Sequence, residues 1–148
     1  MPGYNDFMTE TTYFPDPATI STVLNNTRTI AVVGLSSQPE RAGNYVPVYL
    51  QQAGYKIIPV NPNLTEALGE KAYPDLLSVP EPVDLVLLFQ RSENVPPFVE
   101  QAIAIGAQAV WMQEGIINHA AAETARQAGL LVVMDACMMV EHRQRAGY

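Results

Sequence analysis

Short apolar segments alternate with amphipathic segments from Thr29 to the end of the chain. Five of the apolar segments are as long as β-strands and contain few polar positions, which indicates strands buried on both faces. They span residues 29–34, 56–60, 84–89, 109–112 and 130–134. Between them, apolar residues recur three or four positions apart, which is the spacing of a helix with one buried face. The pattern predicts an α/β domain with a doubly wound, five-stranded parallel sheet and helices on both faces.

The residues at the expected helix ends agree with this alternation. Asp16 and Pro17 suit an N-cap and a first helical position, so the first helix is expected to begin there. Polar side chains that are expected to cap later helices are Asn44, Asn118 and Asp135. Glycines that can adopt positive φ stand just before three of the strands, at Gly54, Gly106 and Gly129.

The order of the strands determines where a ligand would bind. Counted along the chain, the order expected for this type of sheet is 3-2-1-4-5. Its winding reverses between the first and fourth strands, so a crevice is expected between the loops 35–43 and 113–118. The connection 61–83 has only a weak helical pattern and is expected to be mostly loop. We expect one domain over residues 16–148, preceded by an N-terminal arm of residues 1–15.

Composition narrows the classes of function. A chain of 148 residues, 48% of them hydrophobic, is long enough for one domain with one core. The 8 basic and 15 acidic residues give a net charge of −7, which disfavours a nucleic-acid partner. Cys137 is the only cysteine, so intramolecular disulfides are excluded and a reducing compartment is expected. The sequence has neither a signal-peptide pattern nor a long apolar run, so we expect a soluble, cytoplasmic protein with no membrane partner.

The loop after the first strand has the chemistry of a phosphate site. After Gly34, it offers backbone N–H groups, the hydroxyls of Ser36 and Ser37, and the positive end of the following helix. Arg41 could add a bidentate contact to a phosphate. Because a strand, a glycine, a loop and a helix follow one another in any α/β domain, a simple connector remains the alternative.

Missing motifs limit the kind of nucleotide. The fingerprint G-x-G-x-x-G fails, because Ser36 and Pro39 occupy its second and third glycine positions. The second strand is followed by Asn61 rather than by the acidic residue that would bind a ribose 2′-OH in an NAD site. The ATP-binding pattern G-x-x-x-x-G-K-[ST] is also missing. Basic residues near the expected carboxyl edge of the sheet, Arg41, Lys71 and Arg91, favour a ligand with several phosphates.

Four blocks of sequence resemble a known family. They are VVGLSSQPERAGNYVPVYLQQAGYKIIPVNP, GEKAYPDLLSVPEPVDLVLLFQR, AVWMQEGI and LVVMDACMMVEH. Together they resemble the small stand-alone coenzyme A (CoA)-binding proteins of the Rossmann type, and more distantly the N-terminal CoA-binding domain of the succinyl-CoA synthetase α subunit. The resemblance runs from about Arg28 to His142 and implies a single Rossmann-like domain that binds CoA or an acyl-CoA at the carboxyl edge of its sheet.

The resemblance also implies roles for residues of the carboxyl-edge loops. Gly34, Ser36 and Arg41 would hold the pyrophosphate. Asn61 would frame the adenosine end, and Lys71 would bind the ribose 3′-phosphate. Pro62 would frame the adenosine end with Asn61, and Leu35 and Ser37 of the phosphate loop would also contact the ligand. The floor of the site would be lined by Phe89, Gln90 and Arg91. Near the pantetheine arm would lie Gln113, Glu114 and Gly115.

The chain departs from the family pattern at two positions. It has Gly43 two residues beyond the loop arginine, where the family often has serine, and Ala136 after the last strand's aspartate, where the family often has arginine. The departures concern the roles of Gly43 and of residues 135–137, whereas the phosphate loop is unaffected.

The sequence contains no evident catalytic set. Cys137 and His142 would lie about 140° apart around a helix, so they would not form a nucleophile and base pair. Glu114 has no acid or nucleophile as a partner, and the two histidines and one cysteine lack metal-ligand spacing. We therefore expect CoA binding without catalysis. The alternatives are a small NAD(P)-linked or acyl-CoA-processing enzyme and a ligand-responsive regulatory module, and the sequence leaves homodimer formation open.

Overall fold

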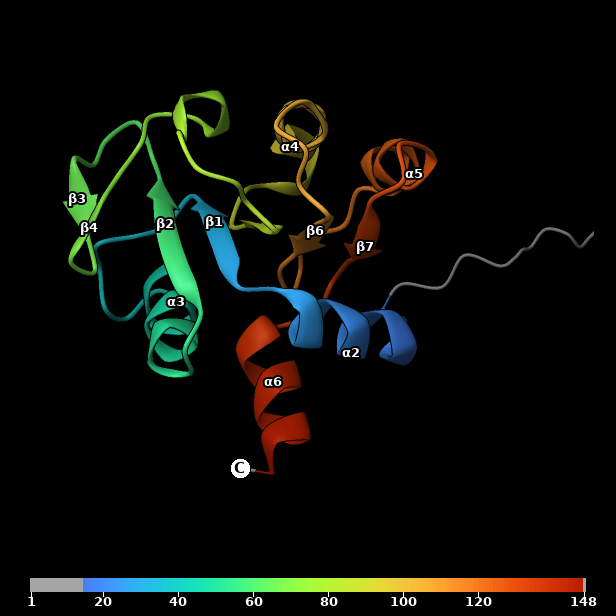
Figure 1. Ribbon diagram of the computed structural model, residues 1–148, viewed down its shortest axis with the longest axis horizontal. Helices are drawn as coiled ribbons and strands as arrows, with labels where there is room; N and C mark the ends of the chain where they lie inside the picture. The colour runs from blue at the N-terminus through green and yellow to red at the C-terminus, as the bar shows by residue number, and fades with distance from the viewer. Residues whose placement is uncertain (1–14, 148) are drawn as a thin grey trace, which may run out of the picture.

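A five-stranded parallel sheet lies between two layers of helices in the computed structural model, which describes residues 15–147 (Figure 1). The strands are β1 (Thr29–Val33), β2 (Lys56–Val60), β5 (Leu85–Leu88), β6 (Ala109–Met112) and β7 (Leu131–Val133). Every pairing within this sheet is parallel. The predicted α/β fold is therefore confirmed. The predicted N-terminal arm lies, apart from Pro15, outside the described residues.

The helices form one layer on each face of the sheet (Figure 1). One face carries α2 (Pro17–Asn26), α3 (Ala42–Gln52) and α6 (Met138–Ala146), and the other carries α4 (Val95–Ala104) and α5 (His119–Gln127). The remaining elements are short: the hairpin of β3 (Glu66–Ala67) and β4 (Glu70–Lys71), and the 3-10 helices η1 (Leu76–Ser78) and η2 (Ser92–Asn94).

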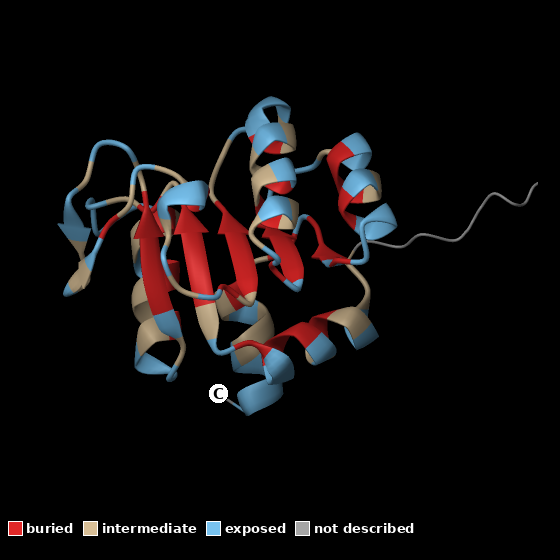
Figure 2. Cartoon of the chain, turned by 45° about the horizontal axis from the view of Figure 1, so that its top comes forward, coloured by how far each residue is buried: buried red, intermediate tan, exposed pale blue. Residues whose placement is uncertain are grey.

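The core has two halves, because alternate residues of each strand point to opposite faces. Ile30 and Val32 pack toward α2, α3 and α6, whereas Ala31 and Val33 pack toward α4 and α5. The strands are consequently buried over nearly their whole length, while the outer sides of the helices are exposed (Figure 2). Trp111 is fully buried, and its Nε1 donates a hydrogen bond to the Ala136 carbonyl at 2.8 Å.

The strand order differs from the one predicted. It is β2-β1-β5-β6-β7, which is 2-1-3-4-5 when strands of this sheet are counted along the chain, so the prediction of 3-2-1-4-5 is wrong. Leu76 and Val83, in the connection from β2 to β5, pack with α4 and α5, on the face opposite α3. Crossovers between parallel strands are right-handed, so connections that cover opposite faces of the sheet move the chain in opposite directions across it. The chain therefore passes β1 and places β5 beside it.

Two of the predicted helix caps are confirmed. Asp16 is the N-cap of α2 and accepts a hydrogen bond from the Ala18 N–H at 3.2 Å and another from the Thr19 hydroxyl at 2.8 Å. Asn118 is the N-cap of α5 and accepts a hydrogen bond from the Ala121 N–H at 2.9 Å. Both side chains satisfy helix N–H groups that have no partner within the helix.

The other two cap predictions are wrong. Arg41 is the N-cap of α3, and Asn44 lies in the first turn, where its Nδ2 donates to the Ser36 carbonyl at 2.7 Å. Cys137 is the N-cap of α6, while the Asp135 Oδ1 accepts from the Gly115 N–H at 2.8 Å. In both cases the side chain bonds to a loop at the carboxyl edge instead of to its own helix.

The connection 61–83 is more regular than predicted, because it contains the β3–β4 hairpin. The tip of this hairpin has positive φ at both Leu68 (56°) and Gly69 (78°). Leucine is unusual at positive φ, where asparagine, aspartate and glycine are preferred, so the sequence lacks the usual signal of such a turn. The Leu68 carbonyl accepts a hydrogen bond from Gln51 Nε2 at 3.0 Å, which joins the hairpin to the end of α3.

Replacement of Asp16 by alanine is expected to lower the free energy of unfolding by about 1 kcal/mol, within the usual range of about 0.5–2 kcal/mol for a lost N-cap. Asp16→Asn should keep most of the stability, because its amide oxygen can still accept the bond from Ala18. Urea unfolding of both variants measures the difference. Equal stabilities of Asp16→Ala and the wild type would show that the cap does not stabilise α2.

Candidate functional site

The turn from β1 into α3 requires a glycine at position 34. Gly34 has φ of +87°, and a Cβ atom built on it would lie 2.3 Å from the carbonyl oxygen of Phe89. A Cβ built on Gly43 would lie 3.1 Å from the carbonyl oxygen of Gly34. Two glycines thus let the backbone of the β1–α3 loop approach both the end of β5 and the start of the loop itself.

Hydrogen bonds within the β1–α3 loop hold it in one conformation. The Ser36 N–H donates to the Gly43 carbonyl at 3.0 Å, and the Gln38 N–H donates to the Ser36 hydroxyl at 3.1 Å. In the described chain, the N–H groups of Ala42 and Gly43 in the first turn of α3 have no protein acceptor. Free N–H groups at the positive end of a helix favour an anion such as a phosphate.

A cleft of about 730 Å³ opens beside the β1–α3 loop. Its walls come from this loop, from the segment after β2 and from the segment after β5. Nine of the predicted residues line it: Gly34, Leu35, Ser36, Ser37, Arg41, Asn61, Phe89, Gln90 and Arg91. It therefore lies between the carboxyl ends of β1, β2 and β5, where the observed strand order reverses direction.

Basic side chains line this cleft on two of its walls. Arg41 is exposed, and its Nε donates to the Gln38 side-chain oxygen at 2.7 Å, which orients the guanidinium. Arg91 is also exposed, and within the described residues its guanidinium has no hydrogen bond or ion pair. The described lining contains no acidic residue. The cleft is therefore locally basic in a protein whose net charge is −7.

Asn61 links two of the segments that line the cleft. Its Nδ2 donates to the Leu35 carbonyl at 2.8 Å, and its Oδ1 accepts from the Asn63 N–H at 2.8 Å. The first bond joins the end of β2 to the β1–α3 loop, and the second fixes the turn that follows β2. Asn61 lines the cleft as predicted, but its amide is engaged within the protein at both ends.

A smaller cavity of about 240 Å³ adjoins the cleft. Gly34, Asn61, Asn63 and Gln90 line both spaces and form the junction between them. Apolar or ring-bearing side chains supply the rest of the lining: Val33, Val60, Pro62, Pro74 and Phe98. Pro62 is thus the predicted site residue that lines the smaller cavity alone.

The remaining predicted residues line neither cavity. Lys71 lies on β4, where its ammonium is 5.4 Å from the centre of the Tyr73 ring. Gln113 is only 4% exposed, and its Oε1 accepts from the Met138 N–H at 3.1 Å. Glu114 and Gly115 are exposed in the turn after β6.

The strand order accounts for the position of the 113–115 segment. With β5 between β1 and β6, the loop after β6 stands one strand farther from the β1–α3 loop than predicted, and only Ile116 of that loop reaches the cleft. Sequence reasoning missed lining residues that flank the predicted positions: Gln38, Ala42, Gly43, Asn63, Leu64 and Ile116. Most of them lie close in the sequence to the predicted phosphate loop or to Asn61, and this position could have suggested them. Position in the sequence alone does not reveal which residues line the cleft.

No metal-binding cluster accompanies the cleft in the described part of the chain. Residues 15–147 contain no group of His, Cys, Asp and Glu side chains that could hold a metal ion. His142 Nδ1 forms a hydrogen bond with the Tyr49 hydroxyl at 2.7 Å, between α6 and α3. In the same residues, no helix has the length and apolar character required to cross a membrane.

The chain thus forms a small Rossmann-like domain, with a cleft beside the β1–α3 loop at the carboxyl edge of its sheet. The model of the family described as a CoA binding domain matches residues 28–143, and the chain belongs to this family. The resemblance inferred from the four sequence blocks is confirmed.

Three relatives show how far the similarity of this chain to known proteins extends. The uncharacterized protein YneT of Bacillus subtilis is 41% identical over 128 residues, which cover 86% of this chain and 95% of YneT. A hypothetical protein from Pyrococcus horikoshii OT3 has a similar structure, with a TM-score of 0.84 and 40% identity over 92% of this chain and 98% of that chain. An ADP-forming acetate–CoA ligase from Archaeoglobus fulgidus is 27% identical over 121 residues, which are 75% of this chain but 18% of the ligase.

Proposed function

We propose that the protein binds CoA or an acyl-CoA in the cleft beside the β1–α3 loop and catalyses no reaction of its own. The observation that carries this proposal is the loop itself, in a chain of the CoA-binding domain family. Arg41, Ala42 and Gly43 line one space, and the N–H groups of Ala42 and Gly43 have no acceptor in the described chain. These groups would hold the pyrophosphate, because each favours a phosphate oxygen.

The size of the cleft supports a ligand of this kind. Its volume of about 730 Å³ lies within the range of about 300–1,000 Å³ that is typical of small-molecule sites. The adjoining cavity extends the space on the far side of Gly34 and Asn61. A long ligand with a polar, phosphorylated centre and less polar ends suits such a pair of spaces.

Asn61 argues against an NAD site. Such a site places a carboxylate after the second strand to accept hydrogen bonds from a ribose. Here the corresponding oxygen, Asn61 Oδ1, already accepts from the Asn63 N–H. Asn61 is an amide, so the protein has no carboxylate at this position, and its amide oxygen is engaged within the protein.

The lining of the two cavities supports binding without catalysis. Neither cavity is lined by a described Asp, Glu, His or Cys, the side chains that most often act as a general acid, base or nucleophile. The aligned region is also a small part of the acetate–CoA ligase, so a ligase reaction would need components beyond it. We propose a ligand-binding domain that acts in the cytoplasm, and a role in regulating another protein would use the same cleft.

Calorimetric titration with CoA, dephospho-CoA, NAD and ATP tests the proposed function. We expect CoA to bind more tightly than NAD and ATP, because neither offers the same combination of pyrophosphate, 3′-phosphate and pantetheine. Incubation with acetyl-CoA should leave the thioester intact at saturating protein. Absence of CoA binding would refute the proposal, whereas thioester loss would refute only the non-catalytic part.

A further inference from the structure

The two cavities share the lining residues Gly34, Asn61, Asn63 and Gln90, and they differ in the polarity of the rest of their lining. The smaller cavity is lined mainly by apolar or ring-bearing side chains, among them Pro74 and Phe98. The larger cleft is lined by both arginines and by the first residues of α3. At about 240 Å³, the smaller cavity is below the range of about 300–1,000 Å³ for a whole ligand, so it suits one ring system of a larger molecule.

Arg91 follows the junction residue Gln90 in the sequence, and hydrogen bonds hold the backbone at this position. Its carbonyl accepts from the Asn94 N–H at 2.9 Å at the start of η2. The next residue, Ser92, accepts from the Ile117 N–H through its hydroxyl, and from the Asn118 side chain through its carbonyl, each at 2.9 Å. A side chain without a protein partner thus projects from a fixed backbone.

We infer that Arg91 recognises the 3′-phosphate of the ligand and makes the protein prefer CoA over dephospho-CoA. The inference rests on the proposed function. With the base in the smaller cavity, the ribose lies at the junction formed by Gly34, Asn61 and Gln90. Its 5′ arm then leads to the N–H groups at the start of α3, and its 3′ side faces the cleft. Because Arg41 binds the pyrophosphate in the proposed function, Arg91 is the arginine of the cleft that remains for the 3′-phosphate.

Lys71 is less suited to this role than the sequence suggested. It lines neither cavity, and its ammonium rests 5.4 Å from the centre of the Tyr73 ring. A cation in this position is already attracted to the electron-rich face of an aromatic ring. A bidentate guanidinium also matches the geometry of a phosphate better than an ammonium does.

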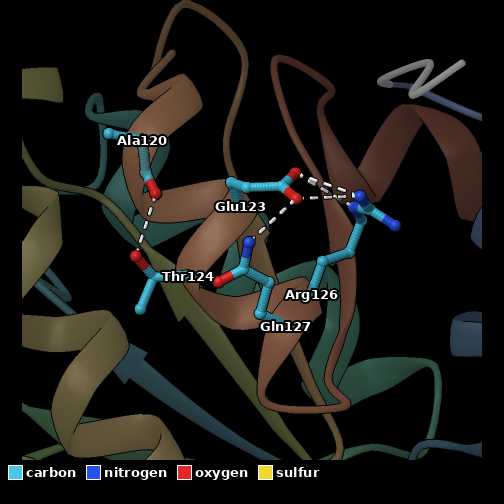
Figure 3. A network of polar contacts seen from close by, with 5 residues as sticks. All are labelled: Ala120, Glu123, Thr124, Arg126 and Gln127. Carbon is cyan, nitrogen blue, oxygen red and sulfur yellow. Dashed lines mark hydrogen bonds and ion pairs between the residues drawn. The ribbon is translucent and has the colours of Figure 1, made fainter. Parts of the chain in front are cut away.

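Calorimetry of single variants tests the inference through the ratio of two dissociation constants, dephospho-CoA over CoA. For the wild type we expect a ratio of about ten or more, since a hydrogen bond to a charged group would be lost with the 3′-phosphate. Arg91→Gln should bring the ratio close to one by weakening only CoA binding. The matched control is Arg126→Gln, which removes the same charge from α5, where Arg126 pairs with Glu123 at 3.0 Å (Figure 3). The control should keep the wild-type ratio.

The outcomes separate this inference from the proposed function. If the wild type binds CoA but Arg91→Gln keeps its preference, the inference is wrong and the proposed function stands. Loss of the preference in Lys71→Gln alone would return the role to Lys71. Circular dichroism of each variant checks that the fold is retained, and failure of the wild type to bind CoA would refute both claims.

Discussion

Gly34→Ala is expected to destabilise the protein by about 2–6 kcal/mol, because it combines backbone strain with a steric clash. A left-handed backbone at a residue other than glycine costs about 1–3 kcal/mol, and Gly34 has φ of +87°. The new Cβ would also lie 2.3 Å from the Phe89 carbonyl oxygen, so β1 and β5 would have to move apart. Overpacking of this kind costs a further amount of about 1–3 kcal/mol.

Gly106→Ala is the matched control for this substitution. Gly106 has φ of +77°, close to that of Gly34, but a Cβ built on it meets no atom within 4 Å. It should therefore show only the conformational cost, about 1–3 kcal/mol. Urea unfolding of both variants isolates the contribution of the close approach to Phe89. Equal losses in the two variants would contradict the tight packing of the β1–α3 loop.

Arg41→Ala is expected to raise the dissociation constant of CoA about 10- to 150-fold, which corresponds to about 1.5–3 kcal/mol for a hydrogen bond to a charged group. The side chain is exposed and lines the cleft, so its loss should change affinity far more than stability. Arg41→Lys should recover only part of the affinity, because an ammonium keeps the charge and loses the bidentate geometry. Calorimetric titration gives both values.

The control for Arg41 is again Arg126→Gln, whose charge lies outside both cavities on α5 (Figure 3). A general effect of net charge would weaken CoA binding equally in Arg41→Ala and Arg126→Gln. A specific contact would weaken it in the first variant only. An unchanged dissociation constant in Arg41→Ala would contradict the assignment of the pyrophosphate to this loop.

The strands were predictable because the sequence reports burial directly. Segments such as Ala109–Met112 contain only apolar residues, and in the structure they are buried on both faces. The position of the loop after β1 beside the cleft was predictable for a different reason. A glycine, two serines and an arginine follow the strand within a few residues. Local chemistry of this kind needs no knowledge of distant contacts.

Strand order could not be obtained in this way. It depends on which face of the sheet the connection 61–83 covers, and this is decided by the packing of Leu76 and Val83 against α4 and α5. Either order would bury the same apolar strands, so the hydrophobic pattern does not distinguish them. The error placed the segment 113–115 at the cleft, although β5 lies between β1 and β6.

The partners of individual polar side chains were equally hidden. Asn61 stands after β2 in the sequence, but only the fold reveals that its amide joins Leu35 and Asn63. Likewise, the position of Lys71 depends on a hairpin whose tip contains Leu68 at positive φ, which local preferences disfavour. Long-range contacts of this kind determine which candidate residues line the two cavities.

A crystal structure of the protein grown with CoA tests the central claim most directly. The diphosphate is predicted to lie within hydrogen-bond distance of the Ala42 and Gly43 N–H groups and of the Arg41 guanidinium. Density for CoA elsewhere on the molecule, or an empty cleft that no neighbouring molecule obstructs at saturating CoA, would contradict it.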